Sequence, residues 1–192
     1  MKLRNHYFIL RHGQTTFQAK KKKFIYPSPE NPPVPLTEKG EKQIETAAQK
    51  LKGKKIKAIY SSDFFRTRQT AGIVAKELGL KVKLDKRLRD LNLGIYHGKT
   101  KEEFYRELPK NSMKRFSQRP KEGESWQDVE ERMRNFIKEI DKRHKNENIL
   151  IISHGDPLWL IKGVVKGLTE EKLLKDREKI YPKTGELKIL NP

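Results

Sequence analysis

The sequence predicts an α/β fold, a three-layer α/β/α sandwich around a mostly parallel central sheet. Short apolar runs rich in strand-forming residues alternate with longer helical segments, an order that places helices on both faces of a parallel sheet. The 192 residues are enough for one domain with a buried core. No apolar run approaches the roughly 18 residues of a membrane span, so we expect a soluble, cytoplasmic protein.

The chain begins with a strand, a long loop and a helix. Residues 7–10 are apolar strand formers, and the run ends abruptly at Arg11. Several prolines between residues 27 and 35 predict that the next segment is a loop. Thr37 has the position of an N-cap for a helix over residues 38–51.

A second strand and helix follow the same pattern. Residues 56–60 form a strand candidate, and residues 64–78 have apolar side chains at helical spacing before Gly79. Alternating apolar residues predict a short strand at 82–84, and residues 101–108 form a weak helix candidate.

The last third contains the clearest elements. Ser125 and Asp128 have the spacing of a capping box, which predicts a helix from there to about residue 144. Residues 148–152 are the clearest buried strand, and an apolar helix is predicted over 158–165. Apolar residues at 187–190 predict a final strand.

Three of these strands end in polar, reactive residues. The first ends at Arg11-His12, the second leads through two serines to Arg66, and the third ends at Ser153-His154. The carboxyl ends of parallel strands meet at one edge of a sheet, where ligands bind. We therefore expect two arginines and two histidines in one pocket.

Such a pocket suits the transfer of a phosphoryl group. Arginines bind phosphate oxygens bidentately and stabilise the charge that develops during transfer. A neutral imidazole is a competent nucleophile when its other nitrogen donates a hydrogen bond. The leaving oxygen then needs an acid, and Asp90, in a loop after a strand, is the candidate. Arginine and histidine supply the positive charge, so we expect no metal and no cofactor.

The composition is strongly basic and contains no cysteine. Lys and Arg total 44 against 25 Asp and Glu, a formal charge of +19. This charge attracts anions such as nucleic acid, acidic lipid headgroups or phosphorylated metabolites, although a lysine-rich solvated surface explains it equally well. No nucleic-acid-binding motif accompanies the four lysines at residues 20–23, so we do not expect a nucleic-acid partner. Without cysteine, disulfides, thiolate nucleophiles and iron–sulfur clusters are excluded.

Four ordered segments resemble the histidine phosphatase superfamily, in its phosphoglycerate-mutase-like branch 1. Residues 10–15 (LRHGQT) resemble the LRHGET signature, and residues 61–71 (SSDFFRTRQTA) resemble SSDLxRxxQTA. Residues 88–98 (LRDLNLGIYHG) resemble LRExxxGxWEG, and residues 153–155 (SHG) resemble the segment of the second histidine. The resemblance implies a single domain over residues 1–192 with a short helical cap inserted at about 99–124.

The resemblance also implies roles for individual residues. His12 would be the phosphorylated nucleophile, and Asp90, which stands where the family usually has Glu, would be the general acid and base. Phosphoryl binding falls to Arg11, Arg66 and His154. The remaining implied pocket residues are Thr15, Gln18, Gln14, Gly155 and Lys101, the last near a substrate-binding lysine of the mutases.

This sequence departs from the family pattern near the site. Asp90 is one methylene shorter than Glu, and Tyr96-His97-Gly98 replaces the usual WEG. His97 is therefore a rival proton donor, as are Glu102, Glu103 and Glu107. A metal site built from His12, His154, Asp90 and Asp156 is disfavoured, because the two arginines would repel a cation.

Four functions fit the sequence. The leading hypothesis is a metal-independent phosphatase that hydrolyses a phosphomonoester of a small metabolite through a phosphohistidine. A phosphoglycerate mutase-type phosphotransferase would use the same histidine, but the short cap at about 99–124 favours hydrolysis because mutases exclude water. A protein phosphohistidine phosphatase is also open, and a basic scaffold or nucleic-acid-binding protein ranks last because the site residues are intact. The sequence does not fix the oligomeric state, for which a homodimer is one option.

Overall fold

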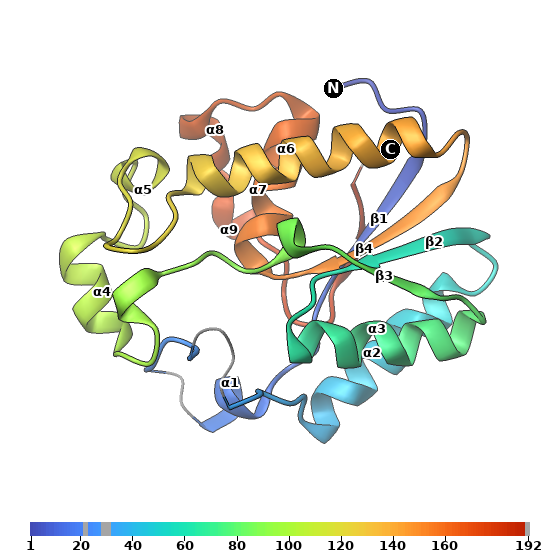
Figure 1. Ribbon diagram of the computed structural model, residues 1–192, viewed down its shortest axis with the longest axis horizontal. Helices are drawn as coiled ribbons and strands as arrows, with labels where there is room; N and C mark the ends of the chain where they lie inside the picture. Colours follow the sequence, from blue (N-terminus) through green and yellow to red (C-terminus); the bar gives the residue numbers. More distant parts are fainter. Residues whose placement is uncertain (21–22, 28–31, 191–192) are drawn as a thin grey trace.

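The computed structural model describes residues 1–20, 23–27 and 32–190, and it has three layers (Figure 1). A central sheet has the strand order β3-β2-β4-β1-β5. Four of these strands are parallel, and β5 runs antiparallel to β1. The predicted three-layer, mostly parallel fold is confirmed. The strands are β1 (His6–Arg11), β2 (Ile56–Ser61), β3 (Val82–Leu84), β4 (Asn148–Ser153) and β5 (Leu187–Ile189).

Alternate residues of each central strand pack on opposite faces of the sheet, as the period of two in a strand requires. In β1, Tyr7 and Ile9 join the core on one face, whereas Phe8 and Leu10 join the core on the other. The strand β4 alternates in the same way and is buried from Ile149 onward. Both faces of the sheet are therefore covered by helices, which explains why these strands read as continuous apolar runs.

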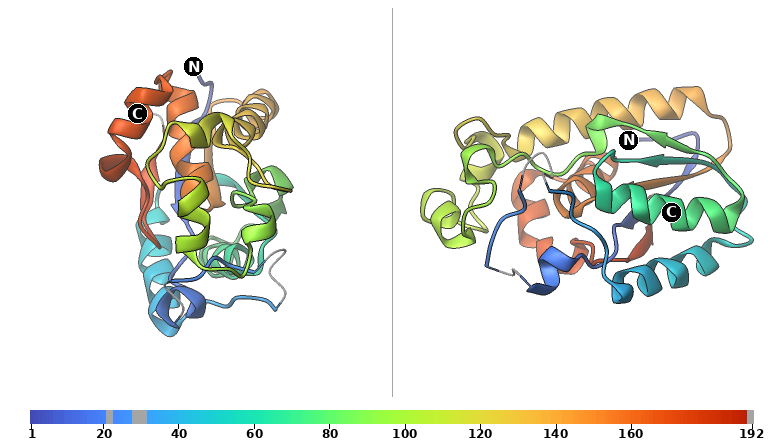
Figure 2. Two further views of the ribbon diagram at one scale, coloured as in Figure 1. Left: turned by 90° about the vertical axis from the view of Figure 1, so that its left-hand side faces the viewer. Right: turned by 60° about the horizontal axis from the view of Figure 1, so that its bottom comes forward.

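Two pairs of helices form the outer layers, as the two views of Figure 2 also show. Helices α6 (Trp126–Arg143) and α7 (Gly155–Lys166) cover one face. Helices α2 (Glu38–Leu51) and α3 (Phe65–Leu78) cover the other. Two short helices, α8 (Glu170–Lys175) and α9 (Arg177–Ile180), follow α7 on its side of the sheet.

The predicted helix boundaries are confirmed where a local signal set them. The Thr37 hydroxyl accepts a hydrogen bond from the Gly40 amide at the start of α2. Ser125 and Asp128 form the reciprocal capping box of α6. Gly79 ends α3 in the left-handed conformation, with φ of 65°.

Several short helices were not predicted, because four to six residues carry no readable periodicity. Helix α4 (Lys101–Glu107) agrees with the helix predicted at 101–108, whereas α5 (Lys114–Ser117) was not predicted. Both helices fall within segment 99–124 and lie beyond one end of the sheet (Figure 1). That this segment is a cap on a single domain stays a prediction. The other unpredicted elements are α1 (Thr16–Lys20), α8, α9 and two 3-10 turns, Lys86–Leu88 and Gly94–Tyr96.

The last described segment folds back onto the end of β1. The Gly185 amide donates to the backbone carbonyls of Arg11 and His12, at 3.2 and 3.0 Å. The Leu190 amide donates to the carbonyl of Tyr7 at the other end of the predicted final strand. Among the described residues, no helix combines the length and apolarity needed to cross a bilayer.

Candidate active site

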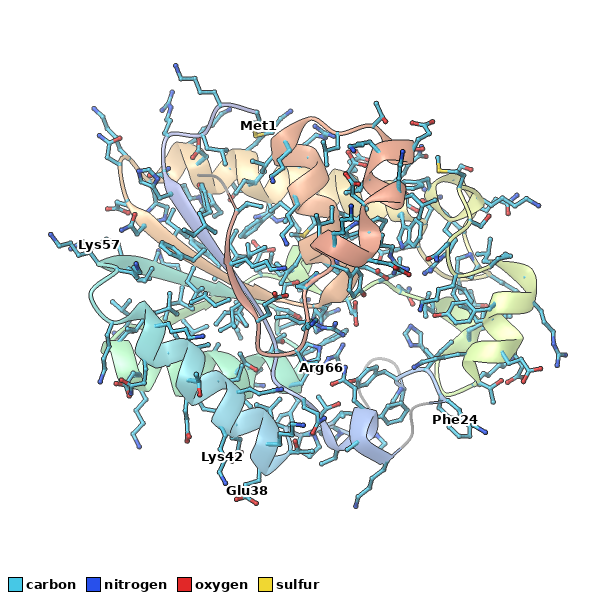
Figure 3. All side chains as sticks on the ribbon, turned by 180° about the vertical axis from the view of Figure 1, so that it is seen from behind. Met1, Phe24, Glu38, Lys42, Lys57 and Arg66 are labelled. Carbon is cyan, nitrogen blue, oxygen red and sulfur yellow. The ribbon has the colours of Figure 1, made fainter. Side chains whose placement is uncertain are left out.

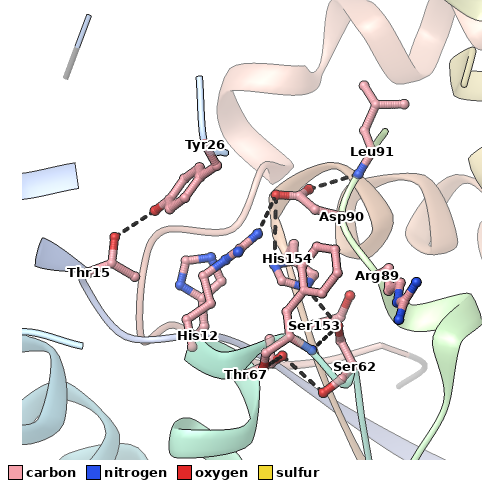
Figure 4. A network of polar contacts seen from close by, with 12 residues as sticks. His12, Thr15, Tyr26, Ser62, Thr67, Arg89, Asp90, Leu91, Ser153 and His154 are labelled. Atoms are coloured by element: carbon pink, nitrogen blue, oxygen red, sulfur yellow. Dashed lines mark hydrogen bonds and ion pairs between the residues drawn. The ribbon is translucent and has the colours of Figure 1, made fainter. Parts of the chain in front are cut away.

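The strand register places two histidines side by side. In the β1–β4 pair, Arg11 lies opposite Ser153, and each strand is followed directly by a histidine. The rings of His12 and His154 have centroids 5.3 Å apart and are both buried (Figure 4). Two residues that are far apart in the chain thus become neighbours at the carboxyl edge of the sheet, as predicted.

A hydrogen bond from one ring nitrogen of His12 leaves the other nitrogen free to react. Its Nδ1–H donates to the carbonyl of Gly13 at 2.9 Å, which leaves the lone pair on Nε2. Burial lowers the pKa of His12 well below its usual 6.5, and the nearby charges of Arg66 and Arg11 lower it further. The imidazole is therefore neutral at physiological pH, which is the form of a nucleophile.

The loop after His12 is fixed by close backbone packing against α2. A Cβ at Gly13 would come within 2.5 Å of the Gly40 carbonyl oxygen. A Cβ at Gly40 would come within 2.1 Å of the Gln14 carbonyl oxygen. Glycine at both positions therefore allows the chain to turn out of β1 and still support the His12 ring.

Arg66 enters the site from the first turn of α3. It is 1% exposed, and its guanidinium carbon lies 4.4 Å from the ring centroid of Tyr26 and 5.1 Å from that of Phe64. Its Nη2 donates to Oδ2 of Asp90 at 3.0 Å. The two rings orient a fixed positive charge that can bind a phosphoryl group.

Arg11 approaches from the end of β1. Its Nη1 donates to the carbonyl of Pro182 at 2.9 Å, and its guanidinium lies over the ring of Tyr181. Its Nε is buried and has no hydrogen-bond partner within the described part of the chain. An anion between Arg11 and Arg66 would satisfy this donor.

Asp90 lies between the arginine and the second histidine. Its Oδ2 is 3.0 Å from Arg66 and 3.7 Å from Nδ1 of His154, and its Oδ1 accepts the Leu91 amide. Burial raises the pKa of this carboxyl above 3.8, Arg66 opposes the rise, and Asp156 adds to it. The side chain is 30% exposed and lines the cleft, so a carboxyl that holds its proton more readily than a free Asp faces the site.

His154 is anchored on one nitrogen only. Its Nε2 and the Ser62 hydroxyl are 3.0 Å apart. Its buried Nδ1 has no hydrogen-bond partner among residues 1–20, 23–27 and 32–190. Burial lowers the pKa of His154 well below 6.5, with Arg66 the largest charge acting in the same direction. This neutral imidazole can make a hydrogen bond to a bound group.

The remaining predicted pocket residues divide into two groups. Gln18 and Lys101 line the cleft described below, whereas the buried Thr15 hydroxyl lies 2.6 Å from that of Tyr26 and so supports the ring over Arg66. The Gln14 side chain accepts from Thr37 at the start of α2 and is not among the lining residues found in the described chain.

Gly155 makes room for a residue that the sequence analysis missed. A Cβ at this position would lie 2.1 Å from the Tyr181 hydroxyl oxygen. Gly155 is therefore needed behind the site, where Tyr181 packs between α7 and Arg11. Tyr26 was missed as well, since neither tyrosine lies in a motif that marks it.

The rival proton donors are engaged elsewhere. His97 donates from Nδ1 to the Tyr26 carbonyl, and its Nε2 accepts the Leu93 amide, so both ring nitrogens are used. Glu103 completes the capping box of α4. Glu102 pairs with Arg106, and Glu107 accepts from Tyr96, both at the surface.

These groups lie beside a cleft of about 940 Å³. Arg11, Arg66 and Asp90 line it together with aromatic and basic side chains from α1, from residues 24–27, from α4 and α5 and from α9. Figure 3 labels two of its lining residues, Arg66 and Phe24. No group of three or more His, Asp or Glu residues in the described chain could hold a metal ion; that the reaction needs none stays a prediction.

With this geometry described, comparison with known proteins identifies the family. The sequence matches the profile of the histidine phosphatase superfamily (branch 1) over residues 7–178. The chain belongs to this superfamily. The predicted family is thereby confirmed, and with it the family-level assignment as a phosphoric monoester hydrolase.

Similar proteins include several that are named probable phosphoglycerate mutases. The probable phosphoglycerate mutase GpmB of Yersinia enterocolitica is 34% identical over 167 residues, covering 84% of this chain and 74% of the relative. The GpmB of Photorhabdus laumondii is 32% identical over 165 residues, with the same coverage.

Solved structures share the fold. YhfR of Bacillus stearothermophilus has a TM-score of 0.79 at 27% identity, covering 96% of this chain and 90% of its own. The alpha-ribazole phosphatase of Shigella flexneri has a TM-score of 0.78 at 21% identity, covering 96% and 89%.

Proposed function

We propose that this protein is a metal-independent phosphatase that hydrolyses a phosphomonoester of a small metabolite through a phosphohistidine on His12. The observation that carries the proposal is the orientation of His12, whose Nδ1 is fixed by Gly13 beside two arginines and a second histidine. Its Nε2 is the group that attacks phosphorus.

In the first step, Nε2 of His12 forms a bond to phosphorus while the bond from phosphorus to the ester oxygen breaks. Arg11, Arg66 and His154 bind the phosphoryl oxygens and stabilise their charge. Asp90 gives its proton to the leaving oxygen. When Arg66 engages the dianion, it no longer holds the Asp90 carboxylate, and the nearby negative charge raises the pKa of Asp90 further.

In the second step, Asp90 acts in the opposite direction. As a carboxylate it removes a proton from water, and the water oxygen attacks the phosphohistidine. The bond from phosphorus to Nε2 breaks, inorganic phosphate leaves, and both His12 and Asp90 return to their starting protonation states.

The direct test is phosphate release from small phosphomonoesters in the presence of EDTA. We expect release by the wild type and loss of at least several orders of magnitude in His12→Ala, which lacks the nucleophile. Activity lost on EDTA treatment, or retained in His12→Ala, would contradict the proposal.

A mutase-type phosphotransferase is the second candidate, since the relatives that match over most of this chain are named as probable phosphoglycerate mutases. Lys101 lies in the cleft, where a second part of a substrate would bind. Incubation with 3-phosphoglycerate separates the two, because a hydrolase releases phosphate and a mutase produces the isomer. Phosphate release from a phosphohistidine-bearing protein would instead indicate a protein phosphohistidine phosphatase.

A further inference from the structure

A second pair of arginines lines the same cleft, away from the histidines. Arg115 comes from α5 and Arg177 from α9. Arg115 is 5% exposed, and the Arg177 side chain is 12% exposed. Such burial is unusual for an arginine and calls for a compensating partner.

Aromatic rings hold both guanidinium groups in place. Arg115 lies 4.1 Å from the ring centroid of Trp126. Arg177 lies 5.2 Å from Trp126, 5.0 Å from Trp159 and 4.7 Å from Tyr181. Rings on these sides fix the direction in which the remaining N–H groups point.

The buried charges of this cluster do not balance. Asp156 is the buried carboxylate that faces both arginines, and its Oδ1 is 3.1 Å from Nη2 of Arg177. Arg115 donates to a backbone carbonyl, that of Lys110. The Nε of Arg177 is buried and has no hydrogen-bond partner in the chain described by the structure. Two guanidinium charges thus share one carboxylate. The remaining buried positive charge destabilises the fold unless an anion binds beside it.

The other charged groups around this cluster do not remove the surplus. Lys101 and Lys110 line the same part of the cleft and add positive charge. Glu178 also lines the cleft, but it is exposed to solvent, where its charge is screened.

A single tyrosine ring connects this cluster with the reaction centre. The ring centroid of Tyr181 is 5.6 Å from the Arg11 guanidinium and 4.7 Å from that of Arg177. The two guanidinium carbons are therefore separated by no more than the sum of these two distances. One small molecule can reach both.

We propose that Arg115 and Arg177 bind a second anionic group of the substrate, a carboxylate or a second phosphate. The inference rests on the proposed phosphatase function and narrows its substrate class to phosphomonoesters that carry another negative charge. The phosphoryl group lies against Arg11 and Arg66, and the second anion lies beyond Tyr181.

The test compares matched substrates that differ in one group. Phosphoglycolate and 2-hydroxyethyl phosphate have the same chain length, with a carboxylate in the first and a hydroxymethyl in the second. A longer pair, 4-phosphooxybutanoate and 4-hydroxybutyl phosphate, covers a larger separation of the two anions. The quantity measured is the ratio of kcat/KM between the members of each pair.

We expect the wild type to prefer the carboxylate in at least one pair by about 10- to 100-fold, the range that a charged hydrogen bond provides. In Arg115→Gln and Arg177→Gln this ratio falls toward one, mainly through KM. Arg106→Gln removes the same charge from an exposed position on α4 and should keep the wild-type ratio. A variant that failed to fold would lose both members of a pair equally.

A binding measurement separates this inference from the proposed function. The same compounds are titrated calorimetrically into His12→Ala, alone and combined with Arg177→Gln. Carboxylate-dependent binding that Arg177→Gln abolishes supports the second site even if no phosphate is ever released. Equal kcat/KM and equal affinity for both members of both pairs, or an equal loss in Arg106→Gln, would overturn it.

Discussion

Replacing Asp90 with asparagine isolates the proton that the proposed reaction needs. Asparagine has the same size, and its amide oxygen can still accept from Arg66 at 3.0 Å, so the fold should be preserved. What is lost is the acidic proton. General acid catalysis contributes about 10²- to 10⁴-fold, so kcat for an alkyl phosphomonoester should fall by that factor, or about 3–5 kcal/mol of barrier.

The two half-reactions can be resolved with p-nitrophenyl phosphate, whose leaving group needs little protonation. Phosphorylation of Asp90→Asn should then stay fast, whereas the water attack that Asp90 assists becomes slow. We expect a burst of nitrophenol equal to the enzyme concentration, followed by slow turnover, and an accumulating phosphohistidine. His12→Ala should show no burst.

The pH profile provides an independent check. The acid must be protonated in the first step, so kcat for an alkyl ester should fall as the pH rises through the raised pKa of Asp90. In Asp90→Asn this descending limb should disappear. An unchanged kcat in Asp90→Asn, or a retained descending limb, would show that another group donates the proton and would refute the assignment of Asp90 as the general acid.

Further predictions concern stability and packing. Gly155→Ala should displace Tyr181, because the new Cβ would lie 2.1 Å from the Tyr181 hydroxyl oxygen, and it should lower both kcat/KM and, by about 1–3 kcal/mol, the free energy of unfolding. Gly72→Ala on α3 is the control: its Cβ would meet no atom within 4 Å, so kcat/KM should stay near wild type and stability should stay equal or rise slightly. Burial lowers the pKa of Lys162 to about 8, so the unfolded chain binds more protons between that pH and 10.5. Stability measured by urea denaturation should therefore rise with pH across this window, by at most about 3 kcal/mol, and Lys162→Met should flatten the rise. Ser125→Ala should cost about 1 kcal/mol through the lost capping box, and an unchanged urea midpoint would contradict that role.

Much of the fold could be predicted because its signals are local. Thr37 and Ser125 mark helix starts through their own hydroxyl groups, and the strand at 148–152 is apolar along its whole length. The meeting of His12 and His154 could be predicted as well, since parallel strands end at the same edge of a sheet.

Other parts of the site have no local signal. Arg115 and Arg177 lie in helices of four residues, and among 44 basic residues an isolated arginine does not stand out. Tyr26 and Tyr181 contact the site arginines only because a loop and the C-terminal segment fold back across the cleft. Positions set by such long-range packing require the tertiary structure.

The hydrogen bonds that join residues 182 and 185 to Arg11 and His12 also bear on when the site is complete. During translation His12 emerges from the ribosome early, but the carbonyl that holds Arg11 and the amide that bonds to the His12 carbonyl are made among the last residues described. A nascent chain that stops before them carries all four family-like segments and still lacks these supports. We therefore expect Arg11 and His12 to be fully positioned only after synthesis has passed this segment.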